Sequence, residues 1–144
     1  MRLKYYVVVD TNVLVSALLK PKSNPGVILK LVEYGIIIPL INEEILNEYK
    51  KVLSRPKFKF PNDIVNNIME IITKNALTIA ENHIELILPD EKDRVFFEVV
   101  MESNKERVSK LVTGNIKHFP MEPFIVTHRE LCETILNDFN KFDL

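Results

Sequence analysis

The chain has 144 residues, of which 47% are hydrophobic and 27% charged, and its formal net charge is −1. These proportions are typical of one globular domain with a sizeable core. The near-neutral charge excludes a nucleic-acid binder that relies on the field of the whole molecule, so any such binding needs a local patch.

Strands and helices are predicted to alternate along the chain. In chain order, apolar runs and helical periodicity predict a strand over 5–10, helices over 12–19 and 27–35, a strand over 36–40, helices over 43–55 and 62–75, a strand over 76–80, a helix over 91–103, strands over 109–113 and 123–127, and a helix over 128–139. The first strand, YYVVVD, is typical of a parallel strand buried on both faces. The pattern predicts one α/β domain over residues 1–144, with a mainly parallel sheet flanked by helices.

The sequence also indicates a compartment. It has neither a signal-peptide pattern nor an apolar run of membrane-spanning length. The single cysteine, Cys132, cannot form an internal disulfide and fits a reducing environment. We therefore expect a soluble cytoplasmic protein that has no contact with a membrane.

Polar residues follow two of the predicted strands. Asp10 ends the first strand, and Thr113, Gly114 and Asn115 end a later one. In parallel sheets, functional sites form beyond the carboxyl ends of the strands. A carboxylate beside a buried strand is costly unless something compensates its charge, so Asp10 needs a partner at this edge.

Two further acids are placed toward the interior by helical periodicity. Glu48 lies at the border of an apolar stripe, where an ion pair with Lys51 is an equally good explanation. Asp93 projects from the buried face of its helix, although it could also reach back in a capping-box role. Asp90 can serve as the N-cap of the same helix.

Clustered carboxylates repel one another, and they survive together when a divalent cation neutralises them. Oxygen ligands favour Mg²⁺ or Mn²⁺ over zinc. The three histidines are scattered and, with one cysteine, form no zinc-binding motif. The residues therefore favour a Mg²⁺ or Mn²⁺ site over a zinc site.

Four blocks follow one another over residues 5–127: VVVDTNVLVSALL, INEEILNEYKKVLSRPKF, LPDEKDRVFFEVV and LVTGNIKHFP. Together they resemble the PIN-domain nucleases, most of all the VapC-like toxins of toxin–antitoxin pairs. The resemblance implies a three-layer α/β sandwich with a parallel central sheet. It also implies a metal-dependent ribonuclease whose acids converge at the carboxyl edge of the sheet.

Carried over by position, the resemblance makes Asp10, Glu48 and Asp93 the catalytic acids and the ligands of Mg²⁺ or Mn²⁺. Thr11 and Asn12 match the DTN motif, and their implied role is to orient Asp10 or a bound water. The hypothesised reaction is hydrolysis of an RNA phosphodiester, assisted by the cation. The implied partners are RNA, a cognate antitoxin protein and a second copy of the chain.

The block TGNIKHF departs from the family pattern. Many PIN domains carry a fourth aspartate here, where this chain has Asn115 and His118. Asn115 can still offer a neutral oxygen, and Asp90 could supply the missing charge. His118 could contact phosphate when protonated, or it could be a surface imidazole packed beside Phe119. The number of metal ions stays open.

Basic groups are needed to hold an RNA backbone. The segment SRPKFKF, residues 54–60, supplies Arg55, Lys57 and Lys59 beside two phenylalanines, a combination that suits single-stranded RNA. A solvated loop with anchoring aromatics is the alternative. Helices 27–34 and 62–75 could form a dimer interface, although packing in the core explains their apolar faces equally well.

Two other classes of function compete with this interpretation. Phosphatases of the haloacid-dehalogenase type want a second aspartate where Asn12 stands, and receiver domains want an acidic pair and a lysine that are not present in the corresponding places. A non-catalytic PIN-like scaffold that binds RNA or a protein stays open, because the fourth acid is missing.

Overall fold

The computed structural model describes residues 3–141. Its strands are β1 (Tyr5–Val9), β2 (Ile37–Ile41), β3 (Leu77–Thr78), β4 (Ser109–Val112) and β5 (Ile125–Val126). They form one sheet in the order β3-β2-β1-β4-β5, and every pairing is parallel. β1 lies in the centre of the sheet, which explains its run of valines, because both faces of this strand are covered.

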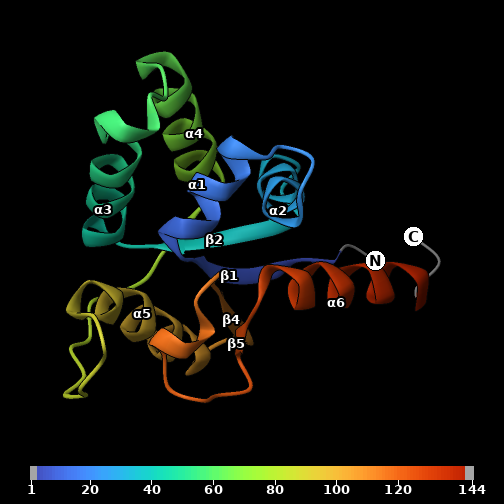
Figure 1. Cartoon of the computed structure of the whole chain (residues 1–144). Coiled ribbons are helices and arrows are strands. Elements are labelled where there is room, and N and C mark those ends of the chain that lie inside the picture. Colours follow the sequence, from blue (N-terminus) through green and yellow to red (C-terminus); the bar gives the residue numbers. More distant parts are fainter. Residues whose placement is uncertain (1–2, 142–144) are drawn as a thin grey trace.

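Helices cover both faces of the sheet. They are α1 (Thr11–Leu19), α2 (Asn24–Glu33), α3 (Glu43–Leu53), α4 (Asn62–Asn75), α5 (Arg94–Asn104) and α6 (His128–Lys141), with short 3₁₀ turns η1 (Pro56–Phe58), η2 (Glu91–Asp93) and η3 (Ile116–His118). In Figure 1, α1 to α4 lie on one side of the sheet and α5 lies on the other. The predicted three-layer α/β sandwich with a parallel sheet is confirmed.

The core joins these layers. Tyr49 of α3 and Phe96 of α5 are among the largest fully buried side chains, and their rings stack with centroids 6.1 Å apart. Contacts of this kind hold α3 and α5 together at one end of the sheet. Across residues 3–141, none of the helices is both long and apolar enough to cross a membrane.

The second helix begins earlier than the sequence predicted. We placed a turn over 21–26 and a helix from 27, whereas α2 begins at Asn24 with Ser23 before it as the N-cap residue. Pro25 fits in the first turn, where its missing N–H needs no partner. Gly26 packs so closely on the backbone of Pro21 that a Cβ built there would lie 1.9 Å from the Pro21 carbonyl oxygen.

The helix that follows Asp90 begins later than predicted. We expected it over 91–103, but residues 91–93 form the turn η2 and α5 starts at Arg94. The Asp90 carboxylate accepts a hydrogen bond from the Lys92 amide at 3.0 Å and so caps η2. Asp93 makes no capping hydrogen bond with its side chain, which leaves its carboxylate for other contacts.

Candidate active site at the carboxyl edge of the sheet

A cavity of about 290 Å³ opens at the carboxyl edge of the sheet, and four carboxylates line it: Asp10, Glu48, Asp90 and Asp93. They come from the end of β1, from α3 and from the chain around η2, which are far apart in the sequence. The structure thus brings together in one cavity the three acids singled out from the sequence and the expected supporting acid.

Asp10 is the most buried of these acids, with 5% of its surface exposed. The hydroxyl of Thr113 donates a hydrogen bond to Asp10 Oδ2 at 2.7 Å, and the Asn12 amide donates to the same oxygen at 3.3 Å. Thr113 is in reach because β1 and β4 are paired up to Val9↔Val112, the residues directly before Asp10 and Thr113. The pairing of the two central strands therefore fixes the orientation of the Asp10 carboxylate.

The electrostatics show that the acids influence one another. Burial raises the pKa of Asp10 to about 6, the hydrogen bond from Thr113 opposes this rise, and the charge of Asp93 adds to it. The pKa of Asp93 is also raised, by burial first and then by the charge of Asp90, with a smaller contribution from Glu48. The cavity therefore disfavours several negative charges at once, and a bound cation would relieve this repulsion.

Thr11 adds an unsatisfied polar atom to the same cavity. Its hydroxyl oxygen is buried and has no hydrogen-bond partner among the described residues. We expected Thr11 and Asn12 to orient Asp10 or a bound water. The Asn12 side chain bonds to Asp10, and Thr11 reaches Asp10 through a backbone hydrogen bond, whereas the side-chain hydroxyl that bonds to Asp10 belongs to Thr113.

The donor set fits a hard divalent cation. Within residues 3–141, no three acidic, histidine or cysteine side chains are already arranged as a metal site. Nevertheless, the groups that line the cavity are mostly oxygen donors, and they include a buried carboxylate and the unpartnered Thr11 hydroxyl. Carboxylate, hydroxyl and amide oxygens are the ligands that Mg²⁺ and Mn²⁺ accept.

Asn115 and His118, which stand where the sequence lacks a fourth aspartate, both line this cavity. The His118 ring places Nδ1 3.2 Å from Asp93 Oδ2, and its presence opposes the rise in the pKa of Asp93. The Asn115 side chain is exposed, while its amide N–H donates to the Thr113 hydroxyl at 2.9 Å. His118 is therefore a partner of an acid in the site.

Comparison with known proteins identifies the fold. A model of the PIN domain matches residues 6–117. The chain belongs to the PIN-domain family. It is also similar to the uncharacterized protein MJ1680 of Methanocaldococcus jannaschii, with 33% identity over 117 residues that cover 79% of this chain and 73% of the relative. No solved structure matches the chain.

PIN domains are generally nucleases, and they typically use divalent metal ions. The carboxylate cavity of this PIN domain is therefore its candidate active site.

Two basic side chains line the cavity of this PIN domain. Arg55, two residues after the end of α3, was expected from the sequence to bind RNA. Lys92, which lies in η2 between Asp90 and Asp93, was missed. Its position between two site acids was the available signal, but a lysine in an acidic turn is equally well explained as solvated surface. Arg55 and Lys92 reach the cavity from two different elements.

The rest of the basic segment lies away from this cavity. Lys57 sits over the Phe58 ring at 5.1 Å, and Phe58 stacks on Phe60 with centroids 5.5 Å apart. The Phe58 ring therefore already has two partners, which favours an anchoring role over base stacking. Lys59 is exposed and adopts a left-handed backbone conformation, with φ 54°.

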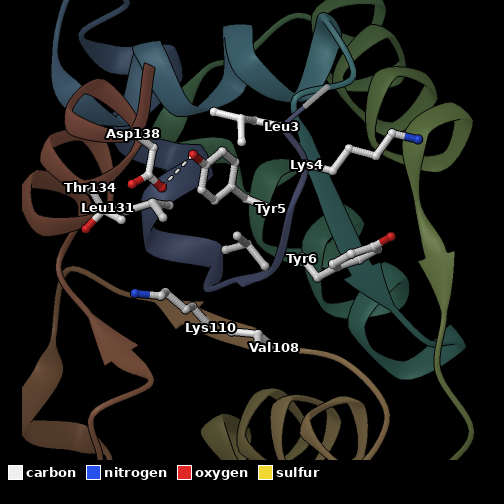
Figure 2. Close-up of a pocket in the computed structure, with 10 residues that line it drawn as sticks. Leu3, Lys4, Tyr5, Tyr6, Val108, Lys110, Leu131, Thr134 and Asp138 are labelled. Atoms are coloured by element: carbon white, nitrogen blue, oxygen red, sulfur yellow. Dashed lines mark hydrogen bonds between the residues drawn. The ribbon is translucent and has the colours of Figure 1, made fainter. Parts of the chain in front are cut away.

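A larger cavity, of about 390 Å³, lies at the opposite edge of the sheet, where β1 begins. Figure 2 shows Tyr5 and Asp138 of α6 facing each other, joined by a hydrogen bond of 2.8 Å. Lys110 and apolar side chains such as Leu131 form other parts of its lining. Among the described residues of this lining, Asp138 is the one acid, so the chemistry expected of a PIN nuclease is concentrated in the smaller cavity.

Proposed function

We propose that this PIN domain is a Mg²⁺- or Mn²⁺-dependent ribonuclease that hydrolyses RNA phosphodiester bonds in the carboxylate cavity. The observation that carries the proposal is the convergence of Asp10, Glu48 and Asp93 from three separate elements on one cavity. Burial first, and then the charge of Asp93, raises the pKa of Asp10, and a bound cation would offset both effects.

Asp10, Glu48 and Asp93 would hold the cation, with Asp90 or the neutral Asn115 as further oxygen donors. When bound, a divalent cation supplies Lewis acidity to the phosphoryl group and lowers the pKa of a water. Asp10 keeps a fixed direction through its bonds to Thr113 and Asn12. Glu48 is half-buried at the cavity and completes the ligand set or orients the attacking water.

The basic side chains have a separate role. A cavity lined by four carboxylates repels a polyanion, so the substrate needs positive charge at the same place. Arg55 and Lys92 supply it, and they would bind phosphates while the acids face the reacting group. Lys57 and Lys59 extend the positive charge beyond the cavity along the segment 55–60.

A cleavage assay on single-stranded RNA tests the function. The wild-type protein should cut RNA with Mn²⁺ and lose this activity when a chelator is added. Asp10→Asn keeps the shape of the side chain and should abolish cleavage, whereas Lys4→Ala, at the opposite edge of the sheet, should cleave like the wild type. Cleavage in chelator, or by Asp10→Asn, would contradict the proposal.

The finer proposal is that the chain is the toxin of a type II toxin–antitoxin pair, as the VapC-like resemblance implies. Its partners would be RNA, a cognate antitoxin and a second copy of the chain. Expression of the wild type should arrest growth, expression of Asp10→Asn should not, and the protein encoded beside it should relieve the arrest. Light scattering tests the expected homodimer.

A non-catalytic role as a scaffold that binds RNA or a protein is the second candidate. The observation in its favour is Asn115, which lines the cavity where many PIN domains carry an acid. RNA that binds to the protein and stays intact in Mn²⁺ would support this role.

A further inference from the structure

One buried hydrogen bond of Tyr49 joins the two elements that carry Asp10 and Glu48. It lies in α3 directly after Glu48, and its side chain is 0% exposed. Its hydroxyl donates a hydrogen bond to the carbonyl oxygen of Val9, the residue directly before Asp10. The helix that carries Glu48 is thereby tied to the strand end that carries Asp10.

The Val9 carbonyl needs this partner, because the sheet does not provide one. On the β2 side, the pairing of β1 runs to Val7↔Pro39, two residues before Val9. The Tyr5 N–H donates a hydrogen bond to the Ile36 carbonyl, directly before β2. Because every second residue of a strand turns its backbone groups to the same side, the carbonyl groups of Val7 and Val9 also face β2. The Tyr49 hydroxyl therefore takes the place of a strand partner at the point where β1 ends.

The ring of Tyr49 reaches the element that follows the third acid. It stacks on Phe96 with an interplanar angle of 29° and centroids 6.1 Å apart. Phe96 lies in α5, three residues after Asp93, and lines the carboxylate cavity. One side chain thus contacts the elements that carry Asp10 and Asp93 while it is itself adjacent to Glu48.

We propose that Tyr49 is a positioning residue of the carboxylate site, which sets the mutual placement of Asp10, Glu48 and Asp93 without touching the substrate. This inference rests on the proposed metal-dependent function. Groups that hydrogen-bond to metal ligands change metal affinity about 10–100-fold when they are mutated. Tyr49 acts one residue away from Asp10, so its removal should fall near the lower end of this range. A merely structural tyrosine would change stability and leave the metal affinity of the folded protein unaltered.

The test compares Tyr49→Phe with Tyr5→Phe. Each removes one hydroxyl that donates a hydrogen bond, but the Tyr5 bond to Asp138 lies at the opposite edge of the sheet. Mn²⁺ binding is measured by calorimetry at a temperature where all proteins are folded, and cleavage of single-stranded RNA is measured beside it. Tyr49→Phe should raise the Mn²⁺ dissociation constant about ten-fold or more and lower kcat with an unchanged KM for RNA, and Tyr5→Phe should match the wild type.

Other outcomes separate the two proposals. A folded Tyr49→Phe protein that binds Mn²⁺ as tightly as the wild type overturns the positioning role. A wild type that binds Mn²⁺ in a Tyr49-dependent way but leaves RNA intact overturns the nuclease function alone, and a wild type that binds no Mn²⁺ overturns both. If Tyr49→Phe does not fold, Phe96→Leu removes the stacked ring instead and should cause a smaller loss of Mn²⁺ affinity.

Discussion

Asp93 is the residue at which a structural and a functional role can be separated most directly. Its side chain is 13% exposed, makes no helix-capping bond and contacts His118. Burial first, and then the charges of Asp90 and Glu48, raise the pKa of Asp93, so its negative charge is unfavourable in the absence of a cation. These observations favour a ligand over a cap.

In chelator, we expect Asp93→Asn to be at least as stable as the wild type, because one repelling charge is removed. The expected gain in the free energy of unfolding is up to about 1 kcal/mol, or roughly 3 °C in melting temperature. Mn²⁺ should stabilise the wild type by mass action and the variant very little. Thermal melts of both proteins, in chelator and in Mn²⁺, measure this. A variant that melts lower in chelator and still responds to Mn²⁺ would make Asp93 a structural cap.

Asn115 permits the opposite experiment. Its side chain is exposed at the cavity, so Asn115→Asp adds a carboxylate without disturbing the core. The added charge should tighten Mn²⁺ binding if the side chain faces the ion. Calorimetric titration of the two proteins shows the difference, and equal affinities would place residue 115 outside the ligand set.

At the scale of the elements, close packing decides whether a substitution in a helix raises or lowers the free energy of unfolding. Helix propensity alone would give the wrong direction at Gly26. Alanine is more favourable than glycine in a helix by about 1 kcal/mol. At Gly26, however, the new Cβ would lie 1.9 Å from a backbone oxygen of Pro21, which cannot rotate away as a side chain would. We expect Gly26→Ala to lower the free energy of unfolding by about 2 kcal/mol, a typical result of overpacking.

Denaturant unfolding at equilibrium checks this expectation. Ser16→Ala, on the exposed side of α1, is the matched control and should stay within about 0.5 kcal/mol of the wild type. An unchanged or higher midpoint for Gly26→Ala would show that α2 can move away from Pro21 at little cost.

The elements also show what a sequence can predict about this fold. The helix over 62–75 was predicted with its correct bounds, because a long amphipathic run follows Pro61. The strand over 76–80 was predicted too long, since β3 is an edge strand of two residues with one neighbour to pair with. The start of α5 was missed because the Asp90 cap closes a 3₁₀ turn first.

The candidate site likewise contains residues that the sequence predicts and residues that it does not. Asp10 was predictable because a strand of valines ends there, and Thr113 because another strand ends beside it. The contact of Tyr49 with the site was not predictable, because its partner Val9 lies 40 positions away in the sequence. Periodicity assigns a buried tyrosine simply to the core. Contacts between distant segments depend on the sheet register, which the sequence pattern does not specify.

At the scale of the whole molecule, the net charge of −1 means that the proposed RNA substrate would need to be held by local contacts. The proposed contacts are Arg55 and Lys92 at the cavity and Lys57 and Lys59 beyond it. For single strands, each phosphate contact contributes about −0.7 to the slope of log affinity against log salt concentration. With these side chains as the contacts, the slope of the whole protein should be about −3.

Binding of fluorescent single-stranded RNA to the Asp93→Asn protein, which should leave the RNA intact, measures that slope over a series of salt concentrations. Arg55→Ala and Lys92→Ala in this background should each reduce its magnitude by about 0.7 and weaken binding at low salt, because each removes one phosphate contact. Lys4→Ala, at the opposite edge of the sheet, should leave the slope unaltered. A slope that survives both cavity substitutions would place the RNA elsewhere on the molecule, and a much steeper slope for the parent would require a basic surface wider than the segment 55–60 and Lys92.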